Sequence, residues 1–248
     1  MRIMLYAGID AGSRAIKAVL VDGETKQIVR MDRCDQGVEQ GKRAAELYDR
    51  ILRDTRKTRD DVQGLVATGY GRNLIDFAGR VVTEISCHAR GVRHLVSDVR
   101  TIVDIGGQDS KLIRLNEAGK VHDFAMNDRC AAGTGRFLEV VAERLGVALE
   151  DLGDLASKST EPASISSMCV VFAETEIIGL MASGVKSSDI VAGVQRSIAQ
   201  RMAGMAGRNV TEPVVFTGGV ALVPGMQSAL EASLKSKIRI APDCQYTG

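Results

Sequence analysis

The chain has 248 residues, of which 45% are hydrophobic and 25% charged, a balance typical of a soluble globular protein with one large domain or two smaller ones. Its formal net charge is +1, its aromatic content is 4% and tryptophan is absent, which argues against nucleic acid or an anionic membrane as the main partner. The sequence has no long apolar run for a spanning helix or a signal peptide, so we expect a cytoplasmic protein.

The first hundred residues predict strands followed by alternating helices and strands. An apolar strand over 3–10 ends in Asp and Gly, and strands over 15–22 and 27–33 follow, joined by the turn residues "DGET". Residues 38–55 carry apolar positions at helical spacing. A strand over 62–69 runs into a glycine turn, and a helix is expected over 84–99.

The opening pattern then returns. Residues 101–127, "TIVDIGGQDSKLIRLNEAGKVHDFAMN", predict strand, glycine turn, strand, turn and strand. Helices are expected over 135–146, 172–183 and 187–207, and the last of these is rich in small residues. A strand over 213–219 runs into a third glycine turn, "TGG".

Two segments of the chain share one spacing. Asp10-x-Gly12-x-x-x-x-Lys17 aligns with Asp104-x-Gly106-x-x-x-x-Lys111, and each lies between an apolar strand and an amphipathic one. A duplicated strand–turn–strand unit indicates two related subdomains. We therefore divide the α/β chain into residues 1–99 and 100–248.

The two glycine turns suit phosphate binding. Without a Cβ, the backbone N–H groups of a glycine turn can approach phosphate oxygens, and a carboxylate at the strand end can hold Mg²⁺ through water. Ser13 and Gln108 could add donors, and Lys17 could neutralise charge. One such turn alone is more often an ordinary hairpin, but the duplication and the third turn favour the phosphate interpretation. The sequence contains neither a P-loop nor a dinucleotide fingerprint.

This arrangement resembles the acetate/sugar kinase, Hsp70 and actin superfamily. "GIDAGSRAIKAVL" is similar to its first phosphate segment, "VDIGGQDSK" to its second and "VVFTGGVALVPGM" to its adenosine segment. The resemblance implies two ribonuclease-H-like, actin-like ATPase domains with a nucleotide cleft between them. It places Gly218 and Gly219 near the nucleotide.

Two of the five cysteines precede predicted helices. Cys130 lies in "NDRCAAGTGRFLEV" and Cys169 in "ISSMCVVFAETEIIG", and the amides at a helix N-terminus favour a negative charge such as a thiolate. Taken singly, a cysteine is more often a small buried hydrophobic residue. We expect that structural role for Cys34, Cys87 and Cys244, with Cys34 and Cys244 at the periphery.

The sequence contains no recognisable metal-binding motif within one chain, because it has no CxxC and no HExxH. Two thiolates supply half of the four ligands that a cubane cluster needs. A twofold axis between two copies of the chain would bring Cys130 and Cys169 of each copy to one site.

At these motifs the resemblance becomes narrower. "NDRCAAGTGRFLEV", "CVVFAETEIIG", "VATGYGRN" and "EISCHA" are similar to the activator, component A, of 2-hydroxyacyl-CoA dehydratases and to the ATP-binding subunits of benzoyl-CoA reductases. The resemblance implies a homodimer with one bridging [4Fe–4S] cluster, bound by Cys130 and Cys169. It departs at "APDCQYTG", after which members of the family continue into an Ala/Gly-rich helix.

The resemblance also implies the activity. A ferredoxin or flavodoxin would reduce the cluster in an anaerobic cell. ATP hydrolysis would then drive one low-potential electron into a dehydratase or reductase partner. Asp10 and Asp104 would organise Mg²⁺ through water, and Glu174 would position the attacking water or simply form a solvated helix start. The remaining expected ATP/ADP contacts and coupling residues are Gly12, Ser13, Lys17, Gly106, Gly107, Gln108, Gly133, Thr134 and Gly135.

Two other functions remain open from the sequence. A small-molecule kinase of the same superfamily would need a catalytic Asp and an acceptor site, for which the sequence has no obvious candidate, and it would be indifferent to air. A filament or scaffold protein of actin type would hydrolyse ATP slowly and assemble without iron.

Overall fold

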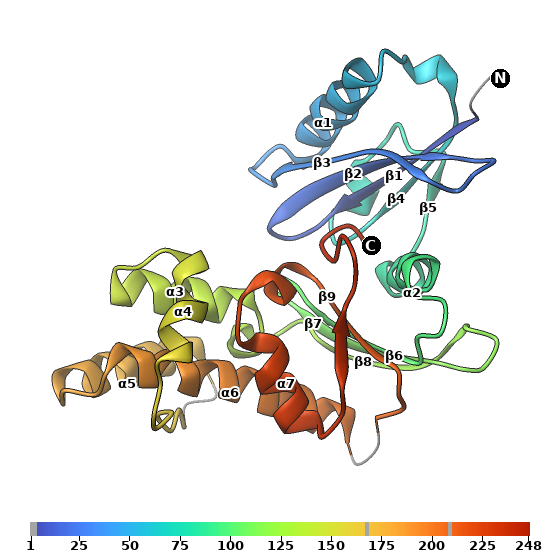
Figure 1. The fold of residues 1–248 in the computed structure, drawn as a ribbon. Helices are drawn as coiled ribbons and strands as arrows, with labels where there is room; N and C mark the ends of the chain where they lie inside the picture. Colours follow the sequence, from blue (N-terminus) through green and yellow to red (C-terminus); the bar gives the residue numbers. More distant parts are fainter. Residues whose placement is uncertain (1–3, 167–168, 208–209) are drawn as a thin grey trace. The chain divides into compact units, whose positions relative to one another are not determined.

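The computed structural model describes residues 4–166, 169–207 and 210–248, which form two units (Figure 1). The first unit comprises the chain up to Gly91 together with Tyr246–Gly248, and the second comprises Val92–Gln245. Helix α2 (Glu84–Leu95) contains the junction between them. The division into subdomains 1–99 and 100–248 stays a prediction.

A five-stranded sheet forms the first unit, with strand order β3-β2-β1-β4-β5. The first three strands pair antiparallel, and β4 and β5 continue the sheet in parallel. Its elements are β1 (Leu5–Ala11), β2 (Ala15–Asp22), β3 (Ile28–Asp35), α1 (Gln40–Asp54), β4 (Val62–Thr68) and β5 (Arg80–Val81).

The core of the first unit follows from two periodicities. Every second residue of β1 is buried, which places one face of the strand in the core. Helix α1 covers this face with an apolar stripe at helical spacing. The stripe consists of Ala44, Leu47, Tyr48, Ile51 and Leu52.

The second unit repeats this plan with strand order β10-β9-β6-β7-β8. The antiparallel strands are β6 (Thr101–Ile105), β7 (Ser110–Leu115) and β8 (Val121–Asn127). The parallel additions are β9 (Val214–Thr217) and β10 (Ile238–Ile240). All five strands therefore have counterparts in the first unit, with β6 equivalent to β1 and β9 equivalent to β4.

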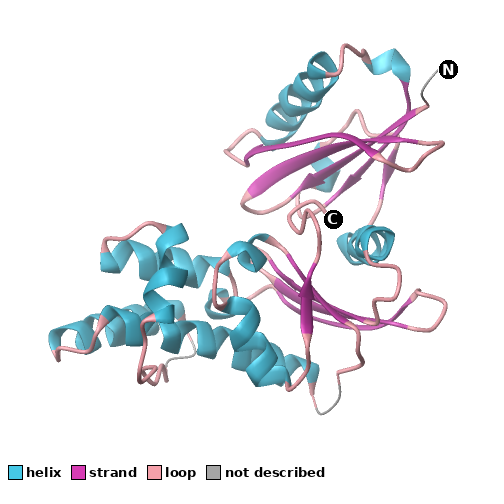
Figure 2. Ribbon diagram, in the orientation of Figure 1, coloured by secondary structure: helices cyan, strands magenta, loops and turns pink. Residues whose placement is uncertain are grey.

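The helices of the second unit gather beside its sheet (Figure 2). Helix α6 packs against β7, β8 and α7, and its Gly193 lets the backbone approach Ala163, whose carbonyl oxygen would lie 2.2 Å from a Cβ at that position. These helices are α3 (Gly135–Leu145), α4 (Leu152–Ser157), α5 (Val170–Ala182), α6 (Ser187–Ala206) and α7 (Met226–Leu234).

The expected α/β class is confirmed, and most of the expected elements lie within a few residues of their predicted bounds. Helix α2 ends at Leu95 rather than at 99, and α4, α7, β5 and β10 were not expected. These four additional elements have nine residues or fewer, too few for a clear periodic signal.

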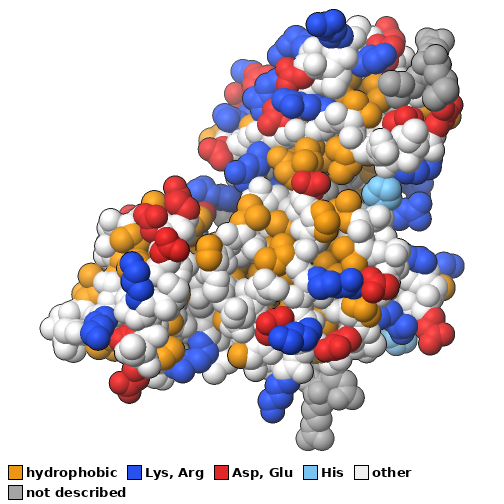
Figure 3. All heavy atoms as spheres, viewed as in Figure 1, with side chains coloured by type: hydrophobic (Ala, Val, Ile, Leu, Met, Phe, Trp, Pro, Cys, Tyr) orange, Lys and Arg blue, Asp and Glu red, His pale blue; other side chains and the backbone are white. Residues whose placement is uncertain are grey.

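Charges of both signs are interspersed on the face seen in Figure 3, in keeping with the near-neutral composition. Acidic side chains gather over the segment that ends α3 and follows it, where Glu143, Glu150, Asp151 and Asp154 are exposed. Among the described residues, no helix combines the length and the apolar character that crossing a bilayer requires.

Candidate functional site

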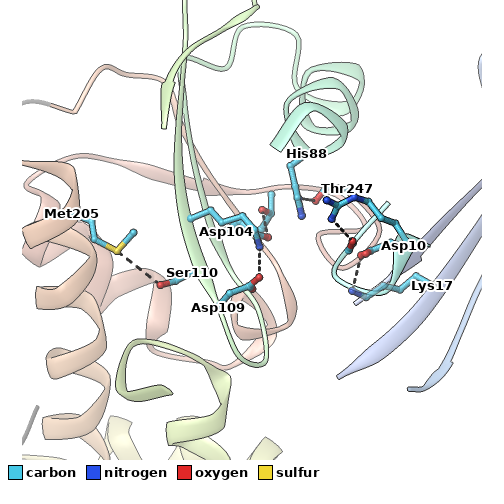
Figure 4. A network of polar contacts seen from close by, with 12 residues as sticks. Asp10, Lys17, His88, Asp104, Asp109, Ser110, Met205 and Thr247 are labelled. Carbon is cyan, nitrogen blue, oxygen red and sulfur yellow. Dashed lines mark hydrogen bonds and ion pairs between the residues drawn. The ribbon is translucent and has the colours of Figure 1, made fainter. Parts of the chain in front are cut away.

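The first predicted phosphate turn leaves the end of β1 in the first unit. Asp10 and Lys17 are direct partners across β1 and β2, and their side chains meet, with Lys17 Nζ 2.9 Å from Asp10 Oδ2 (Figure 4). The Gly12 N–H donates to the Ala15 carbonyl at 3.2 Å and closes the turn. The sequence spacing therefore reflects a cross-strand ion pair beneath a closed turn.

The second turn has the same frame in the second unit. Asp104 and Lys111 are cross-strand partners in β6 and β7, and Gly106 N–H donates to the Asp109 carbonyl at 2.9 Å. Lys111 Nζ lies 3.4 Å from Asp104 Oδ2 and 2.8 Å from Asp109 Oδ2, and its side chain is 2% exposed. The carboxylates of Asp104 and Asp109 lie near each other in Figure 4, and Lys111 pairs with both.

In each unit a third strand adds a threonine beside the carboxylate, and sequence reasoning missed part of this arrangement. Thr68 is the β4 partner of Asp10, and Thr217 is the β9 partner of Asp104. The Thr217 hydroxyl donates to Asp104 Oδ1 at 2.8 Å. Among the described residues, the Thr68 hydroxyl has no oxygen or nitrogen partner, and it faces the Cys87 thiol. The signal was present in "VATG" and "VFTG", which repeat the Thr-Gly pair after an apolar strand.

The glycine after each threonine is required by its surroundings. Gly69 and Gly218 have φ angles of +87° and +88°, a region that side chains with a Cβ rarely adopt. A Cβ at Gly69 would lie 2.3 Å from Asp10 Oδ1, and one at Gly218 would lie 3.0 Å from Asp104 Oδ1. Gly218 was an expected nucleotide residue, and Gly219 follows it at the surface.

A buried histidine is a further neighbour of Asp10 that sequence reasoning did not single out. His88 is 8% exposed, and its Nδ1 lies 3.2 Å from the Thr247 hydroxyl (Figure 4). A Cβ built on Gly248 would be 3.0 Å from His88 Nε2 and 3.2 Å from Asp10 Oδ2. Because both atoms lie this close to one point, His88 Nε2 and Asp10 Oδ2 are within about 6 Å of each other. The carboxylate of Asp10 thus has a polar neighbour besides Lys17.

In the second unit, the phosphate turn is joined to the start of α3. Gly135 N–H donates to the Gly106 carbonyl at 2.9 Å, and Arg136 N–H donates to the Gly107 carbonyl at 2.8 Å. Thr134, the N-cap of α3, is buried, and its hydroxyl accepts from Arg136 N–H. Two amides that a helix leaves unpaired at its N-terminus therefore hold the phosphate turn.

The same segment leads back to Cys130. The Thr134 hydroxyl donates to the Ala131 carbonyl at 2.8 Å, and Asn127, the last residue of β8, exchanges hydrogen bonds of 2.8 and 3.1 Å with the Cys130 backbone. Gly133 is buried between these contacts. A short hydrogen-bonded path thus connects the phosphate turn with the cysteine.

The helix positions of the two cysteines only partly match the expectation. Cys169 directly precedes a helix, as predicted, and the structure shows it as the exposed N-cap of α5. Cys130 instead caps the single 3₁₀ turn Ala131–Gly133, because α3 begins only at Gly135 and its first amides already bind the phosphate turn. The first amides of α3 are therefore not next to Cys130, whereas those of α5 directly follow Cys169.

One chain does not complete a metal site within the described residues. They contain no group of three or more His, Cys, Asp or Glu side chains that could hold a metal ion. Cys130 is half-buried and Cys169 exposed, so two thiols per chain are available at most as part of a shared ligand set.

Helix α5, which follows Cys169, exposes apolar side chains on much of its surface. Val171 and Phe172 are 67% and 69% exposed, and Ile178 and Met181 are also exposed, while Ala173 and Ile177 pack inward. An apolar helix that is this open to solvent is typical of a surface that a partner covers.

Glu174 lies on α5 and forms an ion pair with Arg144 near the end of α3. Glu176, one half-turn further, accepts hydrogen bonds from the backbone and hydroxyl of Ser166. Glu174 therefore connects the two helices that follow Cys130 and Cys169, and its predicted role toward an attacking water stays a prediction.

The other three cysteines lie apart from this segment. Burial raises the pKa of the Cys34, Cys87 and Cys244 thiols above the ordinary value of 9.0, so they remain protonated near neutral pH. Cys244 was expected at the periphery, but it is 3% exposed because its carbonyl receives the Gly218 N–H and ties the C-terminal segment to the glycine turn.

Comparison with known families and proteins identifies extensive similarity. The model described as the BadF/BadG/BcrA/BcrD ATPase family matches residues 7–248. The activator of lactoyl-CoA dehydratase from Anaerotignum propionicum is 43% identical over 247 residues, which cover 99% of this chain and 94% of the relative. A benzoyl-CoA reductase subunit from Thauera aromatica is 34% identical over 255 residues, which cover 98% of this chain and 90% of the relative.

Solved structures agree. Component A of the (R)-2-hydroxyglutaryl-CoA dehydratase from Acidaminococcus fermentans has a TM-score of 0.92 and 41% identity, covering 98% of this chain and 94% of its own. The activator of the 2-hydroxyisocaproyl-CoA dehydratase from Clostridium difficile, with bound ADPNP, has a TM-score of 0.91 and 39% identity, covering 98% and 91%. MreB 5 of Spiroplasma citri, with a TM-score of 0.50 and 12% identity over 98% and 93%, shares the actin-like fold alone.

Proposed function

The chain belongs to the BadF/BadG/BcrA/BcrD ATPase family, and on this premise we propose that it is an ATP-hydrolysing activator of a 2-hydroxyacyl-CoA dehydratase or a related reductase. Its work is to deliver one low-potential electron to that partner. The names and near-complete coverage of the relatives support this assignment.

One observation carries the proposal. The second phosphate turn is bonded through Gly106 and Gly107 to the first amides of α3, and the preceding loop leads directly to Cys130. Hydrolysis and release of a phosphate at the turn would change the charge next to these bonds. The cysteine segment is therefore within reach of a nucleotide-dependent movement.

ATP with Mg²⁺ is bound through the two phosphate turns in this proposal. Asp10 and Asp104 organise Mg²⁺ through water, since carboxylate and water oxygens are its preferred ligands. The amides of Gly12 and Gly106 already close their own turns, so Ser13, Gly107 and Gln108 supply the phosphate donors. Lys17 neutralises phosphate charge, and Gly218 and Gly219 lie beside the adenosine.

The donor set of one chain fits half of a [4Fe–4S] cluster. Cys130 and Cys169 provide two thiolates, and the same two residues of a second copy complete the four. The exposed Val171 and Phe172 directly after Cys169 give such a homodimer an apolar contact surface. When bound, the cluster supplies a one-electron carrier. The chain's own residues hold it and link it to the nucleotide turn.

The remaining partners follow from this role. A ferredoxin or flavodoxin supplies the electron, and the dehydratase or reductase receives it. The protein acts in the cytoplasm of an anaerobic cell.

Anaerobic purification tests the proposal. We expect a coloured dimer with about four irons per two chains. Adding ATP and Mg²⁺ should change the electron paramagnetic resonance spectrum of the reduced protein, because nucleotide binding moves the Cys130 segment. A colourless monomer that binds ATP would instead favour the small-molecule kinase, and iron-free filaments the scaffold protein.

Serine variants test the ligand assignment. Cys130→Ser and Cys169→Ser should each lose most of the iron and still bind ADP, measured by iron assay and calorimetry. Cys34→Ser, at a cysteine of β3, is the matched control and should retain iron. Full iron retention in Cys130→Ser would remove Cys130 from the ligand set.

A further inference from the structure

We call the turn between Asp10 and Lys17 in the first unit and the turn between Asp104 and Lys111 in the second unit the two phosphate half-sites of the proposed function. They differ at one aligned position. The offset that aligns Asp10 with Asp104 also aligns Ala15 with Asp109. The backbone role is the same at both positions, because the Ala15 carbonyl accepts from Gly12 and the Asp109 carbonyl accepts from Gly106. Only the second half-site adds a carboxylate.

This carboxylate changes the environment of the aligned lysine. Lys17 lies 2.9 Å from Asp10, and its side chain is 23% exposed. Lys111 lies 0.6 Å closer to Asp109, at 2.8 Å, than to Asp104, at 3.4 Å, and its side chain is 2% exposed. Withdrawal of Lys111 from Asp109 would separate a buried ammonium group from the carboxylate that lies nearest to it.

The carboxylates next to the two lysines are also held differently. Asp104 is fixed on both oxygens, by Thr217 at Oδ1 and by Lys111 at Oδ2. The aligned Thr68 faces the Cys87 thiol instead of bonding to Asp10. The orientation of Asp104 is therefore fixed by a threonine bond that Thr68 does not give to Asp10.

Formal charges give the same distinction. The Asp10 and Lys17 pair is neutral, so removal of Lys17 to a phosphate leaves the carboxylate for a cation. Asp104, Asp109 and Lys111 together carry one negative charge, and the lysine is enclosed. Such a group suits a hydrated cation better than a phosphate.

We propose that Asp109 is a positioning residue that holds Lys111 and thereby fixes Asp104 toward hydrated Mg²⁺, leaving Lys17 as the lysine that neutralises the nucleotide phosphates. This inference rests on the proposed ATPase function. It gives different roles to two half-sites that otherwise share the same frame because of the duplication. Ala15 in the first half-site adds no carboxylate beside Lys17, whereas Asp109 adds one beside Lys111.

A reciprocal exchange tests the inference. Ala15→Asp gives the first half-site the carboxylate of the second, and Asp109→Ala removes it from the second. ADP binding is measured by calorimetry on the anaerobic protein with and without Mg²⁺, and the Mg²⁺ dependence of ATP hydrolysis is measured by phosphate release.

Ala15→Asp should weaken ADP binding at least about tenfold with or without Mg²⁺, because the new carboxylate holds Lys17 and repels phosphate. Ala15→Asn adds the same volume without the charge and should stay within about threefold of the wild type. Asp109→Ala should raise the Mg²⁺ concentration for half-maximal hydrolysis about tenfold and leave Mg²⁺-free ADP binding within about twofold.

A second pair of variants guards against a folding defect. Lys17→Met should lose ADP affinity without Mg²⁺, whereas Lys111→Met should not, provided thermal unfolding shows that both are folded. Equal loss in both, or an unchanged Mg²⁺ dependence in Asp109→Ala, would overturn the inference. Failure of the wild type to bind ADP would instead overturn the proposed function.

Discussion

Asp10 shows how tightly a single carboxylate is enclosed at the end of β1. Its Oδ2 pairs with Lys17, its Oδ1 lies where a Cβ on Gly69 would clash, and the Gly248 backbone approaches from another direction. A residue packed this closely cannot be replaced without a specific effect on the turn. The proposed role of Asp10 can therefore be tested apart from the proposed cluster ligands, which lie in the second unit.

Replacing Asp10 with alanine should abolish ATP hydrolysis and leave the iron content unchanged. Loss of the Mg²⁺-organising carboxylate should lower the rate of phosphate release by at least about a hundredfold. Asp32→Ala, at a residue of β3 that pairs with Arg50, is the control and should retain the wild-type rate. A fully active Asp10→Ala would reject the assignment of Asp10 to the phosphate site.

Sequence reasoning could find those site residues whose signal is local. Asp10 and Lys17 repeat at a fixed spacing because they face each other across one hairpin. Thr217 is 113 residues from Asp104, and nothing in a local motif ties the two together. Asp109 lay inside the quoted motif, but its role depends on the burial of Lys111, which only the folded sheet reveals.

At the level of secondary structure, α5 has no clear polar face. Its apolar residues surround the helix, two of them pack inward, and Val171 and Phe172 remain exposed beside Cys169. A helix that is apolar on all sides is normally buried. The second copy in the proposed dimer would complete its burial.

Phe172→Asp should therefore prevent dimer formation. A charge in the apolar contact would be desolvated without a partner, and the four-thiolate site would be lost with the dimer. Light scattering after anaerobic size-exclusion chromatography should show a monomer with little iron. Leu74→Asp, at an exposed apolar residue of the first unit, is the matched control and should stay dimeric. A dimeric, iron-bearing Phe172→Asp would exclude α5 from the interface.

Long periodic elements were predictable, and short ones were not. Helix α6 has 20 residues and β2 alternates buried and half-buried positions, so each carries a clear pattern. Strand β10 has three residues and gains its place only by pairing with β9. The start of α3 was predicted correctly, yet its hydrogen bonds to the phosphate turn depend on tertiary structure.

At the scale of the whole molecule, the two units share a five-stranded plan and diverge in what they add to it. The first unit covers its sheet with α1, whereas the second inserts α3, α4, α5 and α6 between β8 and β9. Both proposed cluster ligands lie in this insertion or directly before it. In the proposed function, the two sheets carry the residues that bind the nucleotide, and the insertion carries the residues that bind the cluster.

Titration links the stability of both units to pH. Hydrogen bonds hold the pKa of four carboxyl groups below their ordinary values, the first causes being Glu24 N–H for Asp22, Arg239 for Asp98, Ser159 for Asp189 and Ser236 for Glu212. Burial raises the pKa of the Cys34, Cys87 and Cys244 thiols. The unfolded chain thus binds more protons in acid and releases more in alkali than the folded chain does.

We therefore expect the free energy of unfolding to be greatest between about pH 5 and pH 8 and to fall on both sides. Stability from the four carboxylates is present above their ordinary pKa and is lost as the pH falls through the lowered values. Stability from the protonated thiols is present below pH 9.0, their ordinary pKa, and is lost as the pH rises through their raised pKa values. Urea unfolding from pH 3 to pH 10 measures both changes, in a Cys130→Ser, Cys169→Ser background so that iron loss does not contribute.

Two substitutions separate the acid and alkaline effects. Asp189→Asn removes a carboxylate whose Oδ1 accepts hydrogen bonds from Ser159, Thr160 and Glu161. It should lower the free energy of unfolding at pH 7 and make that free energy fall less as the pH is lowered. Cys244→Ala removes a buried thiol. It should make the free energy of unfolding fall less as the pH is raised and leave its dependence on acid pH unchanged. If Asp189→Asn kept the full acid dependence, the hydrogen bonds around this carboxylate could not be the source of the pH effect, and the other three carboxyl groups would have to carry it.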